Sequence, residues 1–167
     1  AFGSSGERCM ALSVAIAVGD EIADSLISKF GDTISQLKYG HFSDKNNDFG
    51  PVITAQHKAK VIGYINSAEQ QGATIVVDGR NAAPLGYENG FYVGATLIDQ
   101  VTPNMTSYKE EIFGPVLQIM RVKTMQEAMD LINNHEYGNG TCIYTRDGEA
   151  ARYFSDHIKV GMVGIIV

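Results

Sequence analysis

Phe2-Gly3-Ser4-Ser5-Gly6-Glu7-Arg8-Cys9-Met10 is a glycine- and serine-rich stretch that runs directly into an apolar segment, and the rest of the chain is organised around it. If a helix begins near Cys9, its unpaired backbone N–H groups favour negative charge and would stabilise a thiolate. Arg8 adds a fixed positive charge beside the sulfur, as is typical of reactive cysteines. Cys9 is therefore a candidate nucleophile. The alternative interpretation is a buried cysteine that acts as a small hydrophobe. The local sequence supports the two interpretations about equally.

Strand-like and helical segments alternate after this stretch. Residues 13–18 form a continuous apolar run typical of a strand buried on both faces. Residues 20–37 repeat apolar side chains at helical spacing, with Asp20 as the predicted N-cap. Further helices are predicted to start after Thr54, Thr124 and Asp147, and further strands at residues 74–77, 115–122, 141–145 and 162–167. This order predicts an α/β fold, a mostly parallel sheet with helices on both faces.

Two local predictions accompany this fold. Residues 80–105 are dense in turn formers and are expected to make an excursion with its own small hairpin. Cys142 lies in the strand predicted at residues 141–145, so it is expected to be a buried strand residue.

Composition limits the kinds of partner. A chain of 167 residues with 44% hydrophobic residues predicts one domain with a sizeable core. The net charge of −6 argues against a nucleic-acid surface. The apolar runs are shorter than the roughly 20 residues that cross a bilayer, so no membrane partner is expected. Two distant cysteines in an acidic chain without a signal-like segment indicate an intracellular protein without a structural disulfide.

Histidine and acidic residues offer two further sets of candidates. The histidines lie in a loop or near helix ends and are read as solvated, which disfavours a Cys–His hydrolase dyad or a metal site; they are His41, His57, His135 and His157. Lys109-Glu110-Glu111-Ile112-Phe113-Gly114-Pro115 is either a solvated acidic loop or a ligand loop whose carboxylates accept hydrogen bonds from ribose hydroxyls. No glycine cluster has the pattern of a phosphate-binding loop.

Four stretches together resemble the aldehyde dehydrogenase superfamily, in the right order and across the whole chain. They are residues 2–9, Asp48-Phe49-Gly50-Pro51, Gly86-Tyr87-Glu88-Asn89-Gly90-Phe91-Tyr92 and residues 110–115. Three others are most similar to its CoA-acylating branch, the methylmalonate-semialdehyde dehydrogenases. These are residues 6–13, Pro103-Asn104-Met105-Thr106 and Tyr137-Gly138-Asn139-Gly140-Thr141.

The resemblance implies a mechanism and a role for each candidate residue. Cys9 would attack the aldehyde, the thiohemiacetal would pass hydride to NAD, and the thioester would be transferred to coenzyme A. Glu111 would hold the nicotinamide ribose, and Phe113 would pack beside the nicotinamide. Arg8 would face the carboxylate of malonate or methylmalonate semialdehyde, a role suited to a guanidinium group.

The resemblance also implies the context of the chain. Residues 1–167 would be a truncated catalytic domain, with the nucleotide-binding half before Ala1 and the dimerisation strand after the last residue. The parent would be a homo-oligomer in the cytoplasm, or in the mitochondrial matrix if the source is eukaryotic. Ile166 departs from the asparagine that the family tends to have in the final strand. The alternatives are a dehydrogenase with a hydrolytic second step, a non-catalytic α/β fragment, and a thiol hydrolase.

Overall fold

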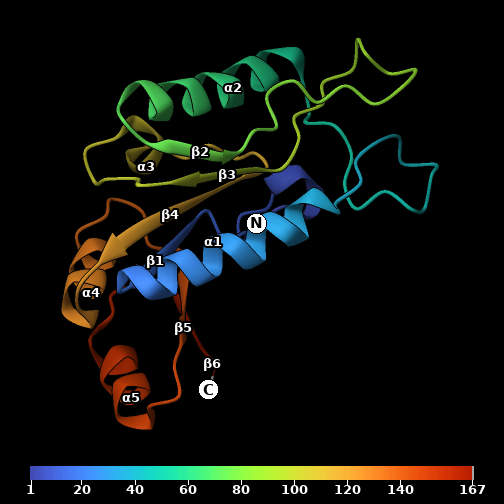
Figure 1. Cartoon of the computed structure of the whole chain (residues 1–167). Helices are drawn as coiled ribbons and strands as arrows, with labels where there is room; N and C mark the ends of the chain where they lie inside the picture. The colour runs from blue at the N-terminus through green and yellow to red at the C-terminus, as the bar shows by residue number, and fades with distance from the viewer. Residues whose placement is uncertain (167) are drawn as a thin grey trace.

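Four strands form the main sheet of the molecule, and helices cover both of its faces (Figure 1). The computed structural model describes residues 1–166. In spatial order the strands are β1 (Val14–Val18), β4 (Val116–Val122), β3 (Thr96–Asp99) and β2 (Thr74–Val77). Strands β1, β4 and β3 are parallel, and β2 is antiparallel to β3. The predicted mostly parallel α/β fold is confirmed.

Five α-helices accompany the strands in the described part of the chain. They are α1 (Asp20–Ser35), α2 (Ala55–Gln70), α3 (Thr106–Lys109), α4 (Met125–Asn133) and α5 (Gly148–His157), and a short 3₁₀ helix lies at Gly3–Gly6. Within residues 1–166, every helix is too short or too polar to cross a bilayer.

Two apolar clusters, one on each face, hold the sheet and helices together. Met120 of β4 packs in the same cluster as Ile65 of α2. Its neighbour Ile119 points to the opposite face, where it shares a cluster with Ala23 of α1. Because successive side chains of a strand point to opposite faces and both faces of β4 are covered, its first five residues are all buried, and four of them are apolar. The exception is Gln118, whose Nε2 donates to the carbonyl of Ser107 at 2.9 Å. The continuous apolar runs in the sequence reflect this double burial.

Helix starts were predicted correctly at three of four sites. Thr54, Thr124 and Asp147 each accept a hydrogen bond from a backbone N–H in the first turn of the helix that follows. Asp20 is not a cap, because α1 is preceded by Gly19 at φ +99° and Asp20 is already helical. Its carboxylate instead accepts a hydrogen bond from Arg121 Nη1 at 3.3 Å.

The middle of the chain differs from its prediction. No separate hairpin forms between residues 80 and 105, because β3 enters the main sheet between β2 and β4. Residues 92–99 are all buried. The turn residues before them therefore carry the chain back to a central strand, and local turn density alone could not reveal that pairing.

The last two strands form a sheet of their own. β5 (Gly140–Tyr144) and β6 (Met162–Ile166) pair in parallel as a two-stranded sheet, separate from the other four strands. Cys142 is exposed on this sheet, so the prediction of a buried Cys142 is wrong. An alternating strand exposes one face wherever no layer covers it. The predicted final strand also included Val167, which lies outside the described residues.

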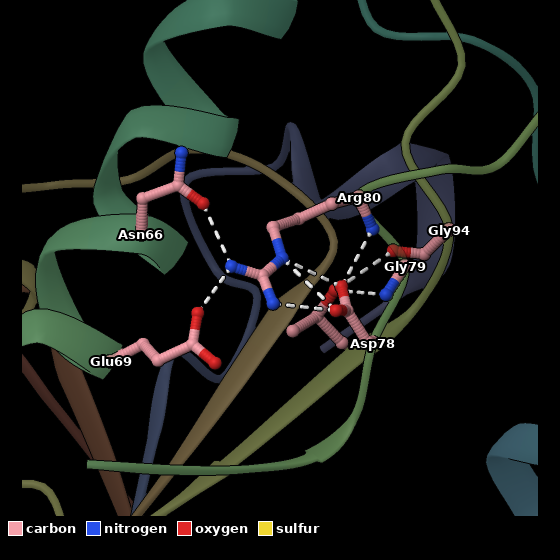
Figure 2. A network of polar contacts seen from close by, with 7 residues as sticks. Asn66, Glu69, Asp78, Gly79, Arg80 and Gly94 are labelled. Carbon is pink, nitrogen blue, oxygen red and sulfur yellow. Dashed lines mark hydrogen bonds and ion pairs between the residues drawn. The ribbon is translucent and has the colours of Figure 1, made fainter.

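Arg80 joins α2 to the end of β2 (Figure 2). Its Nε donates to Asp78 Oδ1 at 2.9 Å and its Nη2 to Asp78 Oδ2 at 2.6 Å. Its Nη1 reaches across to α2, where it donates to Asn66 Oδ1 at 2.8 Å and also pairs with Glu69. The hydrogen bond from Arg80 lowers the pKa of Asp78 below its ordinary value of 3.8. Ionised Asp78 therefore stabilises the folded state relative to the unfolded state.

Replacing Asp78 by asparagine should lower the free energy of unfolding at pH 7 by up to about 1 kcal/mol, because the charged acceptor is lost at an exposed site. Since the folded pKa of Asp78 lies below the unfolded one, its contribution is complete above about pH 4 and is lost as the pH falls through the folded pKa. Urea unfolding at pH 7 and pH 3 should show a stability gap between wild type and Asp78→Asn that narrows at pH 3. A gap of equal size at both pH values would contradict this account.

The matched control is Asp156→Asn. Among residues 1–166, the carboxylate of Asp156 is exposed and makes no hydrogen bond or ion pair. This control should leave the unfolding midpoint unchanged at both pH values.

Candidate active site

All four residues singled out in the sequence line one pocket. Arg8 and Cys9 enter it from the loop before β1, and Glu111 and Phe113 enter it from the loop between α3 and β4. The pocket has a volume of about 40 Å³, room for a few water molecules. The structure thus brings together residues that lie about a hundred positions apart in the chain.

Cys9 lies in a turn, and no α-helix begins there. Gly3–Gly6 is 3₁₀, with Ser4 and Ser5 at positive φ, and the backbone N–H of Ala11 then donates to the carbonyl of Arg8 at 2.9 Å. The prediction that a helix start stabilises the thiolate is wrong, because the chain turns once and becomes strand β1 at Val14. Cys9 is exposed, so the alternative of a buried structural cysteine does not hold either.

Arg8 is the nearest fixed positive charge in the sequence to Cys9. Its Nε donates to Ser4 Oγ at 2.9 Å, which holds the side chain along its own loop. In the described part of the chain, the two terminal nitrogens of the guanidinium make no hydrogen bond or ion pair. Arg8 can therefore offer an N–H donor from each of two nitrogens to a carboxylate in the pocket.

A close backbone crossing brings the two loops together. A Cβ atom on Gly6 would lie 2.0 Å from the carbonyl oxygen of Gly114, and Gly6 has φ +72°. A Cβ atom on Gly114 would lie 2.7 Å from a methyl carbon of Val61 in α2. Both positions therefore require glycine. Ser5, the residue before Gly6, holds the cysteine loop to a third segment, because its Oγ donates to the carbonyl of Gly50 at 2.6 Å.

The paired carboxylates have different surroundings. Glu110 accepts a hydrogen bond from the hydroxyl of Tyr64 at 2.6 Å, and burial together with this bond raises the pKa of Tyr64 to about 12. Glu111 lines the pocket and, within residues 1–166, has no hydrogen-bond partner for its carboxylate. Glu110 therefore anchors the loop, and Glu111 is available to a ligand.

The sequence did not assign a role at the site to three residues, Asn139, His57 and Glu7. Asn139 Nδ2 donates to the carbonyl of Cys9 at 2.7 Å. His57 Nε2 lies 2.6 Å from the carbonyl of Phe113 and 3.4 Å from a carboxylate oxygen of Glu7. The histidine was read as a solvated residue near a helix end, but its side chain is only 16% exposed. The sequence gives its place in the first turn of α2, and only the tertiary structure shows what that turn contacts.

The described structure pairs none of the histidines with Cys9. Among residues 1–166, no histidine nitrogen makes a hydrogen bond with the Cys9 side chain. The same residues contain no group of three or more His, Cys, Asp or Glu side chains arranged to hold a metal ion. The geometry is that of an exposed thiol beside an arginine, a free carboxylate and an aromatic ring.

Comparison of the sequence with known proteins identifies close relatives. Malonate-semialdehyde dehydrogenase of Pseudomonas aeruginosa is 60% identical over 167 residues, which are all of this chain and 34% of the relative. The human mitochondrial methylmalonate-semialdehyde/malonate-semialdehyde dehydrogenase [acylating] is 45% identical over all of this chain and 31% of its own length. The chain thus spans about a third of the length of these relatives.

Solved structures agree with this relationship. The methylmalonate-semialdehyde dehydrogenase of Oceanimonas doudoroffii matches with a TM-score of 0.96 and 74% identity, over 98% of this chain and 34% of that one. A Sinorhizobium meliloti protein described as a methylmalonate-semialdehyde dehydrogenase and complexed with NAD matches with a TM-score of 0.96 and 50% identity, over 98% and 33%. The sequence profile of the aldehyde dehydrogenase family matches residues 1–166. This chain therefore belongs to the aldehyde dehydrogenase family.

Proposed function

We propose that this chain carries the nucleophile and one side of the nicotinamide site of an NAD-dependent, CoA-acylating dehydrogenase for malonate or methylmalonate semialdehyde. The observation that carries the proposal is the single pocket lined by Cys9, Arg8, Glu111 and Phe113. The malonate and methylmalonate semialdehyde activities named for the relatives support the substrate class.

Cys9 supplies the nucleophile. Its sulfur attacks the aldehyde carbon to form a thiohemiacetal, and oxidation of that adduct leaves an acyl thioester on Cys9. NAD, when bound, supplies the hydride acceptor for this oxidation. The thiol of coenzyme A then takes the acyl group and restores the free thiol of Cys9. The acylating activity named for the human relative supports this last step.

Glu111 and Phe113 fit the nicotinamide end of NAD. The carboxylate of Glu111 has no partner among residues 1–166 and can accept hydrogen bonds from ribose hydroxyls. The ring of Phe113 is 38% exposed and offers an aromatic surface beside it. The NAD complex of the Sinorhizobium meliloti relative supports NAD as the cofactor.

Arg8 fits the far end of a semialdehyde that carries a carboxylate. Its two terminal nitrogens, which carry four N–H donors between them, stay free once Nε is held by Ser4. A guanidinium group pairs with a carboxylate through two parallel hydrogen bonds. This pair would orient the aldehyde end of the substrate toward Cys9.

The remaining parts of the site belong to the rest of a longer enzyme. A pocket of about 40 Å³ is too small to enclose a dinucleotide. We propose that residues 1–167 are part of a catalytic domain, and that the nucleotide-binding and dimerisation segments lie in the other two thirds of the relatives' length. The protein of that length is called the full-length enzyme below.

Cys9→Ala in the full-length enzyme should lower kcat by roughly 10⁴-fold or more, because no other group can form the thioester. The measurement is NADH absorbance with methylmalonate semialdehyde, NAD and coenzyme A, together with mass spectrometry of the acyl product. Cys142→Ala is the matched control, since Cys142 is also an exposed thiol but is not among the residues that line the pocket.

Each outcome of this experiment decides one part of the proposal. An active Cys9→Ala variant would remove Cys9 as the nucleophile. If the wild-type enzyme forms only the free acid, then water and not coenzyme A is the acyl acceptor. Normal activity of Cys142→Ala is expected in either case.

Arg8→Leu should raise the KM for malonate semialdehyde far more than the KM for propionaldehyde. Loss of a charge-assisted pair corresponds to about 1.5–3 kcal/mol, and propionaldehyde has no carboxylate to lose. Steady-state kinetics with both aldehydes give the two ratios. Equal losses on both substrates would show that Arg8 acts on the loop or the thiol instead of the substrate carboxylate.

The 167-residue chain alone should neither turn over substrate nor bind NAD tightly. Holding the nicotinamide against the thiohemiacetal can account for roughly 7–11 kcal/mol of a barrier, and the chain supplies one side of that arrangement. Calorimetric titration with NAD and an NADH assay test both expectations. Micromolar binding or steady NADH formation would place the whole nucleotide site within these residues.

A further inference from the structure

His57 connects three segments that meet at the candidate active site. It lies in the first turn of α2, and its side chain is 16% exposed. Its Nε2 is 2.6 Å from the carbonyl oxygen of Phe113 and 3.4 Å from Oε1 of Glu7. Glu7 is two residues before Cys9, and Phe113 is two residues after Glu111. One ring nitrogen therefore contacts both loops that line the pocket.

The two partners fix which ring nitrogen carries the proton. A backbone carbonyl and a carboxylate are both acceptors, so Nε2 must be the donor to either one. The bond to Phe113 is the shorter of the two and makes Nε2–H the proton-bearing form of the ring. His57 can thus hold the Phe113 carbonyl without a change of charge.

Phe113 needs such a bond. Its φ is +53°, a left-handed conformation that costs a bulky side chain energy and persists only where neighbouring contacts impose it. On its C-terminal side, Gly114 is held between Gly6 and Val61. The bond from His57 fixes the Phe113 carbonyl itself, so the peptide cannot rotate to relieve the strain.

Glu7 extends the same arrangement to the cysteine loop. Its Oε1 accepts a hydrogen bond from the backbone N–H of Ile53 at 3.2 Å, and its side chain is 17% exposed. Ile53 directly precedes Thr54, the N-cap of α2, and His57 lies three residues after it. The start of α2 therefore binds one residue of each loop, and the distance between the loops depends on it.

We propose that His57 is a positioning residue that locks the strained Phe113 peptide and sets its place relative to Cys9. Given the proposed function, His57 prepares the surface on which the nicotinamide rests before NAD binds. The residue acts through Phe113 and takes no part in proton transfer.

The first test is hydrogen exchange of the protein, which needs no activity. The backbone N–H of Val116 donates to the carbonyl of Gly114 at 2.8 Å, so its exchange reports how firmly the Phe113–Gly114 segment is held. In His57→Leu, this amide should exchange about tenfold faster, the factor expected for one lost hydrogen bond. His57→Gln, which keeps an N–H donor, should restore slow exchange. The cap of α2 is unaffected, because the bond to Thr54 comes from the backbone N–H of residue 57.

The matched control is His157→Leu. His157 also contacts a backbone carbonyl, that of Tyr153 at 2.8 Å, but the contact lies within α5 and is not part of the pocket. Exchange of the Val116 amide should equal that of wild type in this control. If His57→Leu does not fold, His57→Asn, which is polar but too short to reach the carbonyl, takes its place with the same expectation.

The second test uses the full-length enzyme. His57→Leu should raise the KM for NAD about tenfold, while the KM for the semialdehyde changes by less than about twofold, and His57→Gln should recover most of the loss. A general loss of stability would move both constants together and lower the unfolding midpoint.

The two proposals can fail separately. Unchanged exchange of the Val116 amide in His57→Leu, or no recovery with His57→Gln, would overturn the role of His57. A wild-type enzyme without NAD-dependent turnover would overturn the proposed function, and the exchange experiment would still decide whether His57 locks the Phe113 peptide.

Discussion

The backbone crossing of Gly6 and Gly114 is the contact on which the candidate active site depends. A Cβ on Gly6 would collide with the carbonyl of Gly114, so only glycine lets the cysteine loop approach the Phe113 loop this closely. Gly114 in turn lies against Val61 of α2, where a Cβ would also not fit. The pairing of β1 with β4 brings the two loops to the same end of the sheet. The sheet thus supplies the coarse placement, and Gly6 sets the final separation of the two loops that form the pocket.

At each loop, one residue binds the scaffold and the next faces the pocket. Glu7 accepts from the backbone of Ile53, and Arg8 is left exposed beside Cys9. Glu110 accepts from Tyr64, and Glu111 is left free. The held side chain orders the backbone of its loop before a ligand binds, so less backbone entropy is lost on binding.

Patterns with a local cause could be predicted from the sequence. The capping side chains of Thr54 and Asp147 and the doubly buried run in β4 follow from backbone geometry within a few residues. The missing helix at Cys9, the exposed Cys142 and the central position of β3 depend on contacts with distant segments. The resemblance found the four pocket residues, but the pattern could not show what His57 touches, because its partners lie in two other loops.

The glycine crossing also affects when the site can form as the chain is synthesised and folds. Its two residues are far apart in the sequence, so closing this contact costs loop entropy that is recovered only when the parallel strands pair. During synthesis, Cys9 leaves the ribosome long before Gly114 does. Until then the nascent thiol has neither Glu111 nor Phe113 beside it, and it lacks the surroundings that the folded pocket gives it.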